Sequence, residues 1–174
     1  MLRNVGMRTY STIAVMGAVA LLTAAHVQTQ SGQANAAKPI GACTLLTAAE
    51  VKKLAGVADP LNLYERMRPE EETVGKGSSC NYPSMHVQID PFPWTTIESV
   101  RAKNTAEYAA VPGVGDAAFL RANKAAASLE FAELYARIGA HVVTIQMDVP
   151  DGSSTASVKS GLVALANAYI AKLR

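Results

Sequence analysis

Hydrophobic and polar positions alternate most strictly toward the C-terminal end of the chain. Residues 143–149 place an apolar side chain at every second position, and residues 129–138 show the same alternation less perfectly. Gly139 and Ala140 separate the two runs. A period of two is typical of a half-buried strand, and two such runs joined by a short glycine turn indicate a β-hairpin. We therefore expect a hairpin over residues 128–149.

Three other segments carry helix patterns. Thr47 and Glu50 have the spacing of a capping box, which predicts a short helix that ends at Gly56. Residues 95–104 begin with a similar cap signature. Residues 153–173 have one apolar stripe at steps of three and four, as in a helix that packs on a sheet. The stripe consists of Val158, Leu162, Leu165, Tyr169 and Leu173.

The segments between these helices supply further strands. Residues 85–89 alternate strictly, and residues 117–121 are expected to form a short strand. Residues 61–67 alternate in part and are also expected to be a strand, whereas the acidic and then glycine-rich residues 69–79 are expected to be an exposed loop. The order of helix, strands, helix, strands and helix indicates the α+β class. We expect an antiparallel sheet with helices packed on one face.

The first 36 residues have the pattern of an export signal. Arg3 and Arg8 precede an uncharged, mostly apolar run over residues 11–27. A polar stretch then leads to the triplet Ala-Asn-Ala at residues 34–36, the small-x-small pattern that signal peptidase requires. We therefore expect residues 1–36 to be a cleavable signal peptide.

Cleavage after Ala36, or after Ala37, leaves a single domain over residues 37–174. This mature domain is expected to be periplasmic or secreted, without a stable membrane anchor. Two alternatives stay open at the N-terminus. The apolar run is about 17 residues long, at the short end for a transmembrane helix. Residues 40–43 look like a loose lipobox, but a polar spacer separates the cysteine from the apolar run.

The net charge of the whole chain differs from that of the mature domain. The chain has 16 basic and 14 acidic residues, a formal net charge of +2. Arg3 and Arg8 account for this excess, so the domain without its leader is neutral. A neutral domain without a basic stripe has no electrostatic reason to bind nucleic acid or an anionic membrane surface. We expect no nucleic-acid partner.

The two cysteines gain meaning from the expected export. Disulfides persist in oxidising compartments, and two cysteines allow only one pairing, Cys43 with Cys80. Closing this loop should stabilise the fold by roughly 4 kcal/mol in the chain-entropy model. A redox-active pair is the weaker interpretation, because no Cys-x-x-Cys motif is present. We expect a structural disulfide.

Several segments resemble a group of known domains. The segments Cys43–Val51, Cys80–Tyr82 and Val111–Ala118, with the hairpin and the last helix, are similar to small exported bacterial domains of unknown function. Many of these are actinobacterial lipoproteins, and some are extracellular parts of sensor kinases. The resemblance covers most of residues 43–173 and implies an α+β sheet, helices on one face and a disulfide from the first helix to an early strand. It implies no catalytic residue, and the chain lacks the usable lipobox of the lipoproteins.

Candidate chemistry is sparse after the leader. His86 and His141, with Met85 and Met147 nearby, suggest a copper site, since thioether and imidazole suit Cu(I). Adjacent strand residues point to opposite faces, however, so surface histidines and core methionines are the favoured interpretation. No serine-nucleophile or phosphate-loop motif is present. We expect no catalytic residue, no metal and no cofactor.

The last candidates form a possible contact surface of Arg66, Arg68, Trp94 and Tyr108. Trp94 is the single tryptophan and lies between prolines and a helix cap. An exposed aromatic ring on a loop often marks a contact surface, although this ring could equally cap the core. We predict a non-catalytic, disulfide-stapled binding domain for an envelope protein or a small ligand. The alternatives are a small periplasmic hydrolase with an unrecognised site and a weak metal-binding protein.

Overall fold

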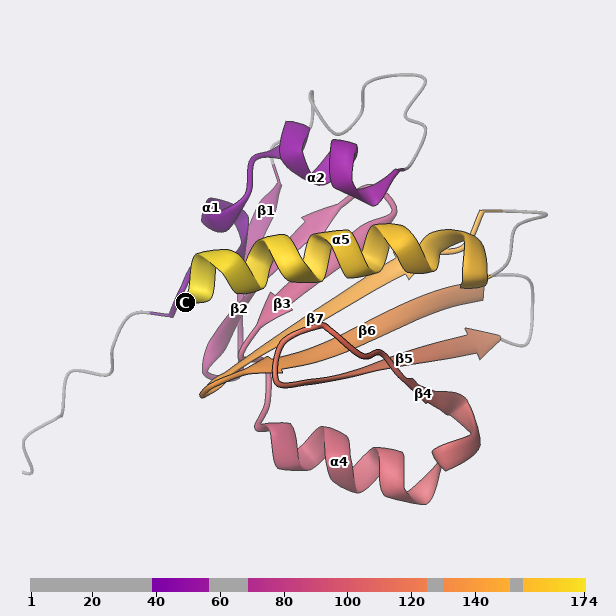
Figure 1. Cartoon of the computed structure of the whole chain (residues 1–174). Helices are drawn as coiled ribbons and strands as arrows, with labels where there is room; N and C mark the ends of the chain where they lie inside the picture. Colours follow the sequence, from indigo (N-terminus) through magenta and orange to yellow (C-terminus); the bar gives the residue numbers. More distant parts are fainter. Residues whose placement is uncertain (1–38, 57–68, 125–129, 151–154) are drawn as a thin grey trace, which may run out of the picture. The chain divides into compact units, whose positions relative to one another are not determined.

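The computed structural model describes residues 39–56, 69–124, 130–150 and 155–174. Within these ranges the chain forms one seven-stranded antiparallel sheet of order β1-β2-β3-β7-β6-β5-β4, with helices packed against it (Figure 1). This is the expected α+β class. The strands are β1 (Glu70–Val74), β2 (Gly77–Tyr82), β3 (Met85–Ile89), β4 (Tyr108–Ala110), β5 (Ala117–Lys124), β6 (Glu130–Ile138) and β7 (His141–Asp148). The helices are α1 (Ala42–Leu45), α2 (Ala48–Ala55), α4 (Trp94–Lys103) and α5 (Thr155–Leu173), with a 3-10 turn η1 (Thr105–Glu107).

The sheet consists of two meanders that meet in its centre. Strands β1 to β3 form one, and β4 to β7 form the other. They join where β3 pairs antiparallel with β7, with Val87 opposite Ile145. The predicted hairpin is confirmed as β6 and β7, and its turn contains Gly139 with a φ of 57°. Every second residue of β3 is buried, which explains its strict apolar alternation, whereas in β7 Val142 and Thr144 on the other face are buried as well.

One face of the sheet, here called the α5 face, carries the main core. Its strand residues include Val87, Leu134 and Ile145, all with no exposed surface. Helix α5 lies across this face, and Leu162 and Leu165 of its predicted stripe are fully buried. Burying each such side chain contributes about 1.5–3 kcal/mol. The α5 face is therefore the main source of the hydrophobic stabilisation.

Helix α2 packs directly on α5. Gly161 permits this approach, because a Cβ at that position would overlap the carbonyl oxygen of Ala55. The predicted capping box is present: the Thr47 side chain accepts from the amide of Glu50, and the Glu50 carboxylate accepts from the amide of Thr47. The amide and the hydroxyl of Thr47 both donate to the Glu50 carboxylate, and these two hydrogen bonds lower the pKa of Glu50. Gly56 ends the helix with a φ of 65°, in the left-handed region that favours glycine.

The predicted disulfide joins Cys43 of α1 to Cys80 of β2, with the Cα atoms 5.0 Å apart. A hydrogen-bond bridge supports the same junction. The Ala42 amide donates to Oγ of Ser78 over 2.7 Å, and the Ser78 hydroxyl donates to the carbonyl of Ile40 over 2.7 Å. The start of the described chain is therefore attached to β2 both covalently and through a buried hydroxyl.

Helix α4 packs on the opposite face of the sheet, here called the α4 face. Trp94 and Ile97 of this helix form a second cluster with Tyr135 and Val142. Successive strand residues point to opposite faces, so Tyr135 and Val142 lie on the face away from their sequence neighbours Ala136 and Val143, which belong to the main core. Figure 1 shows α5 and α4 on either side of the sheet. The expectation that the helices pack on one face is therefore not confirmed. Only Trp94 and Ile97 of α4 are buried, so its sequence has no apolar stripe from which its packing face could be predicted.

A β-hairpin replaces the loop expected over residues 69–79. Strand β1 pairs with β2 from Glu70 opposite Asn81 to Val74 opposite Gly77. Strand β1 lies at the edge of the sheet, where charged side chains are tolerated and oppose pairing with other chains. Its acidic run therefore marks a protected edge strand, and the interpretation as a loop is wrong.

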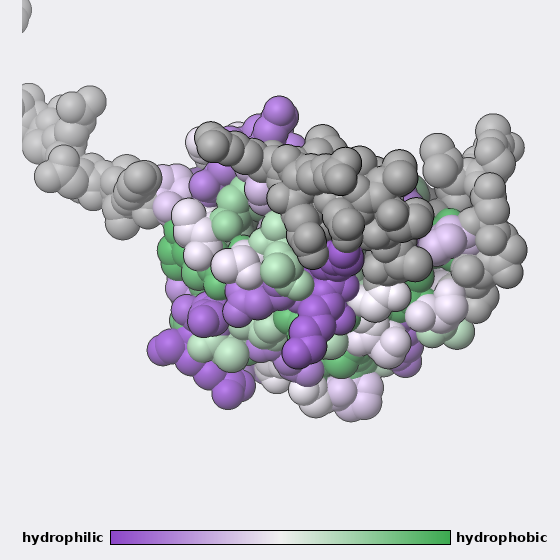
Figure 2. All heavy atoms as spheres, turned by 90° about the horizontal axis from the view of Figure 1, so that it is seen from above, coloured by the Kyte–Doolittle hydropathy of each residue, from purple (hydrophilic) through white to green (hydrophobic). Residues whose placement is uncertain are grey.

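Some predictions concern residues that the structure does not describe, and two concern strands that differ from what was expected. The signal peptide, the cleavage position and the strand expected over residues 61–67 lie outside the described residues. Strand β4 forms where only a connection was expected, and β5 is longer than predicted. No helix in the described ranges is both long and apolar enough to cross a membrane. Figure 2, seen from the α2 side, shows hydrophilic and hydrophobic residues intermixed over the visible described surface.

Candidate functional site: the α4 face of the sheet

The register of the sheet places one polar side chain from every strand in a line across the α4 face. This line, here called the polar row, runs from the β1 edge to the β4 edge. It joins both meanders through the β3–β7 pair. Its members are Glu70, Asn81, His86, Gln146, Glu133, Arg121 and Tyr108, each opposite the next.

The half of the row on β4, β5 and β6 is internally paired. Glu133 accepts from the hydroxyl of Tyr135 at 2.8 Å and lies 3.3 Å from the Arg121 guanidinium. Arg121 also contacts Glu107 at 3.2 Å and lies over the Tyr108 ring. Burial, followed by the charge of Glu133, raises the pKa of Tyr135 well above its usual range. The groups in this half hold one another, so their role is to attach η1 and β4 to the sheet.

The half of the row on β2, β3 and β7 is different. Asn81, His86 and Gln146 are half-buried, and their side chains form no hydrogen bond with any other described residue. With Asp148 they line a polar hollow of about 170 Å³. Two amides, an imidazole and a carboxylate offer both donors and acceptors. These groups are suited to bind a ligand that is rich in polar atoms.

Thr144 adds an unsatisfied group to the same face. Its side chain is 4 % exposed, and among the described residues its hydroxyl has no hydrogen-bond partner. It lies two positions from Gln146 on β7 and opposite Gln88 of β3. A buried hydroxyl without a partner costs about 1–3 kcal/mol. A bound group that reached this hydroxyl would recover that cost.

A second, larger hollow lies at the end of this face where α4 begins. Its volume is about 440 Å³, within the range of small-molecule sites. Most of its wall is apolar, and two charged residues complete it. The lining residues are Gly75, Lys76, Asp90, Pro91, Phe92, Pro93, Ala140 and Val142.

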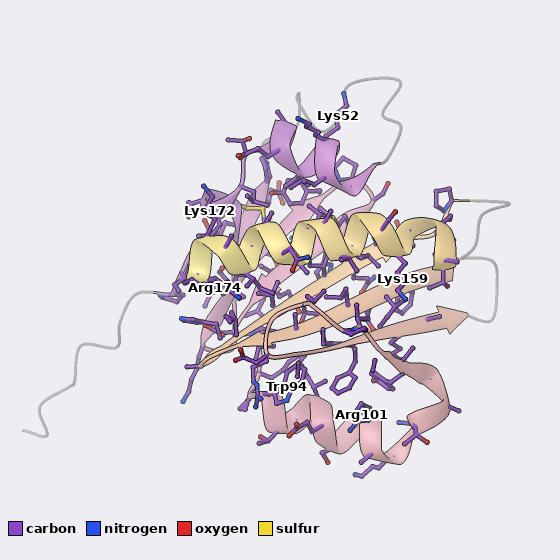
Figure 3. The ribbon with its side chains drawn as sticks, viewed as in Figure 1. Lys52, Trp94, Arg101, Lys159, Lys172 and Arg174 are labelled. Atoms are coloured by element: carbon purple, nitrogen blue, oxygen red, sulfur yellow. A yellow bond between two sulfur atoms is a disulfide. The ribbon has the colours of Figure 1, made fainter. Side chains whose placement is uncertain are left out.

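Trp94 is not an exposed contact residue, contrary to one of the two interpretations of the sequence. Its ring is 7 % exposed and stacks on Phe119 with the centroids 5.6 Å apart. The Arg101 guanidinium lies 4.3 Å from the Phe119 centroid, and that of Arg137 lies 5.6 Å from the Trp94 centroid. Figure 3 shows Trp94 and Arg101 on α4, below the sheet in that view. Trp94 therefore seals the core beneath α4.

The other predicted residues have mixed outcomes. Tyr108 packs against the same cluster as Trp94 and ends the polar row. Arg66 and Arg68 lie outside the described residues, so they stay predictions. Sequence reasoning missed Asn81 and Gln146 as candidates. The alternation placed Gln146 on a polar face but did not reach Asn81, and only the strand pairing shows that the two lie in one row.

The two histidines do not share a site. His86 lies opposite Gln146, five positions from His141 along β7, a separation of about 17 Å at roughly 3.3 Å per residue. His141 instead contacts the Asp90 carboxylate through Nδ1 at 2.8 Å. In the ranges that the structure describes, no group of three or more histidine, cysteine or acidic residues could hold a metal ion.

The chain matches no protein-family model, no curated protein and no solved structure at a significant level. The resemblance to small exported bacterial domains therefore stays a prediction. What the molecule itself defines is an α+β domain with a disulfide and an incompletely satisfied polar face.

Proposed function

We propose that this protein is an exported, non-catalytic binding domain that holds a small ligand or an envelope partner on the α4 face of its sheet. The observation that carries this proposal is the unpaired half of the polar row. Asn81, His86 and Gln146 are half-buried and make no hydrogen bond with the described residues. Buried polar groups usually find partners, and half-buried groups beside a hollow find them in solvent or in a bound molecule. A bound molecule would supply them here.

Two further observations support the proposal. The Cys43–Cys80 disulfide fits an oxidising compartment, in agreement with the expected signal peptide. The acidic and phenolic groups at the other end of the row are already engaged with one another, as Glu133 is with Tyr135 and Arg121. Burial and the charge of Glu133 raise the pKa of Tyr135, so this phenol keeps its proton near neutral pH, which favours binding over catalysis by this group.

The test is native mass spectrometry of the protein exported from the cell and purified without chelator. We expect a retained mass, or binding of envelope material added back to the purified protein. The double variant His86→Ala/Gln146→Ala should lose it, because it removes the central polar groups of the hollow. The matched control is Lys159→Ala, an exposed residue of α5 that lies away from this face (Figure 3).

Two results would contradict the proposal. One is binding that the double variant retains in full. The other is a mature mass that still includes residues 1–36, which would remove the argument for export. Near-ultraviolet circular dichroism of each variant would show that the fold is unchanged, so that a loss of binding can be assigned to the site.

A further inference from the structure

The large hollow at the start of α4 has walls that are held in place. Gly75 and Gly77 let the β1–β2 hairpin approach the chain after β3 closely. A Cβ at Gly75 would stand 2.6 Å from the carbonyl oxygen of Pro91, and one at Gly77 would overlap that of Ile89. Any other residue at these positions would push the two walls apart. The hollow is therefore a fixed feature of the backbone.

Asp90 forms part of the rim and is held by its neighbours. Its φ of 52° is in the left-handed region, unusual for a residue with a side chain. Its Oδ1 accepts from the amide of Val142 at 2.7 Å, and its Oδ2 lies 2.8 Å from Nδ1 of His141. Both carboxylate oxygens of Asp90 are thus already engaged by groups of β7.

The cation on the wall of the hollow, Lys76, has no such partner among the described residues. Lys76 lines the hollow, is exposed and forms no ion pair with a described residue. Arg137 lies opposite Val142 in the β6–β7 register. Its Nε is buried without a hydrogen-bond partner among the described residues. Lys76 is therefore the one charged group on the wall of this hollow that no described residue pairs, and Arg137, whose guanidinium lies over Trp94, is not part of the wall.

We propose that this hollow binds a small amphipathic anion, with an apolar body against Pro91, Phe92 and Val142 and an acidic group toward Lys76. The inference rests on the proposed binding role of the α4 face and assigns to it a second site, separate from the polar hollow, with its own ligand class. The volume of about 440 Å³ is enough for a compact organic acid. The apolar wall supplies the affinity, and the cation selects the anionic end.

The test uses two fluorescent probes that differ in charge. The first is 8-anilinonaphthalene-1-sulfonate, an aromatic anion, and the second is the neutral N-phenyl-1-naphthylamine. Lys76→Gln should weaken binding of the anionic probe by about two- to five-fold, as loss of an exposed ion pair predicts, and leave the neutral probe unchanged. Ala140→Phe, which fills the hollow from an exposed turn, should weaken both by about ten-fold or more. Lys159→Gln on α5 is the control and should change neither.

Two results would overturn the inference. If each probe bound Ala140→Phe as tightly as it binds wild type, the probes would bind elsewhere. An unchanged preference for the anion in Lys76→Gln would remove the assigned role of the charge. Either result leaves the proposed function standing if His86→Ala/Gln146→Ala still loses the retained molecule. The converse result is also informative. If the probes behave as expected but His86→Ala/Gln146→Ala keeps the retained molecule, the polar row is not the binding site of that molecule.

Discussion

The two faces of the sheet are built from the same seven strands but satisfy their side chains differently. On the α5 face the strand residues that form the core are apolar, and α5 and α2 pack on this core. On the α4 face, helix α4 contributes only Trp94 and Ile97 to a small cluster, and a polar row crosses every strand. Half of that row is paired internally, and the half on β2, β3 and β7 is not.

The difference indicates a division of work within one sheet. Apolar burial on the α5 face and the Cys43–Cys80 disulfide supply the stability. The α4 face can then keep unsatisfied groups, such as the Thr144 hydroxyl, whose cost the other face offsets. Proteins often retain such local costs at functional sites. Substitutions on the two faces should therefore have opposite kinds of effect.

The largest effect is expected from removing the disulfide on the α5 side. The variant C43A/C80A should lose about 4 kcal/mol of unfolding free energy, because the unfolded chain regains the entropy of an open loop. For a domain of this size, the melting temperature should fall by more than about 10 °C. Calorimetry of the variant and of reduced wild type checks this, since both should melt together. Equal melting of the oxidised wild type and the variant would show that the bridge is dispensable.

Truncations of comparable size on the two faces should separate them directly. Leu165→Ala on the α5 face should cost about 3 kcal/mol, because Leu165 is fully buried and leaves a cavity. Gln146→Ala on the α4 face should change stability by less than about 0.5 kcal/mol. Urea unfolding of both variants measures the two values. Similar costs would mean that the polar row is structural, and the division of work would be wrong.

Thr144→Val tests the unsatisfied hydroxyl. Valine has nearly the shape of threonine without the hydroxyl, so the change should stabilise the free protein by about 1 kcal/mol. The same variant should bind the natural ligand less well if that ligand reaches Oγ1. Thermal unfolding with and without the retained molecule measures both effects. A loss of stability in the free protein would reveal a hydrogen-bond partner for Thr144, such as a buried water.

The smallest effect concerns pH and the capping box of α2. In the folded protein the pKa of Glu50 lies below its ordinary value, because Thr47 donates hydrogen bonds to the carboxylate. Its contribution to stability is therefore fully present above the unfolded pKa and is lost as the pH falls through the folded pKa. Between about pH 6 and about pH 3, wild type should lose slightly more of its melting temperature than Glu50→Gln. Identical pH profiles would mean that the box contributes nothing measurable.

Local patterns in the sequence predicted the parts of the fold that local physics determines. The alternation around Val143 and Ile145 predicted the β6–β7 hairpin, and Thr47, Glu50 and Gly56 predicted both ends of α2. The cysteine pair was predictable because two cysteines leave one pairing. In each case the residues that decide the structure are close in sequence or few in number.

The candidate site could not be predicted in the same way. The polar row depends on β3 pairing with β7, so His86 and Gln146 become neighbours across about 60 positions of sequence. No local period encodes that register. Likewise, the acidic residues of β1 predict a loop unless the strand is known to lie at an edge. Trp94 shows the same limit, since its burial depends on Phe119 of a strand that comes later in the chain.

The central pairing of β3 with β7 has a consequence for how the chain comes into being. Synthesis reaches β3 by residue 89, but its partner spans residues 141–148. Until β7 is made, β3 is an unpaired edge rich in apolar residues, and such edges template pairing with other chains. Long-range pairing of this kind also folds slowly. The disulfide joins residues 43 and 80, both of which precede β3, so it can form and order the first meander while β3 still lacks its partner β7. A chain that stops before β7 should therefore aggregate through β3, however well its first half is oxidised.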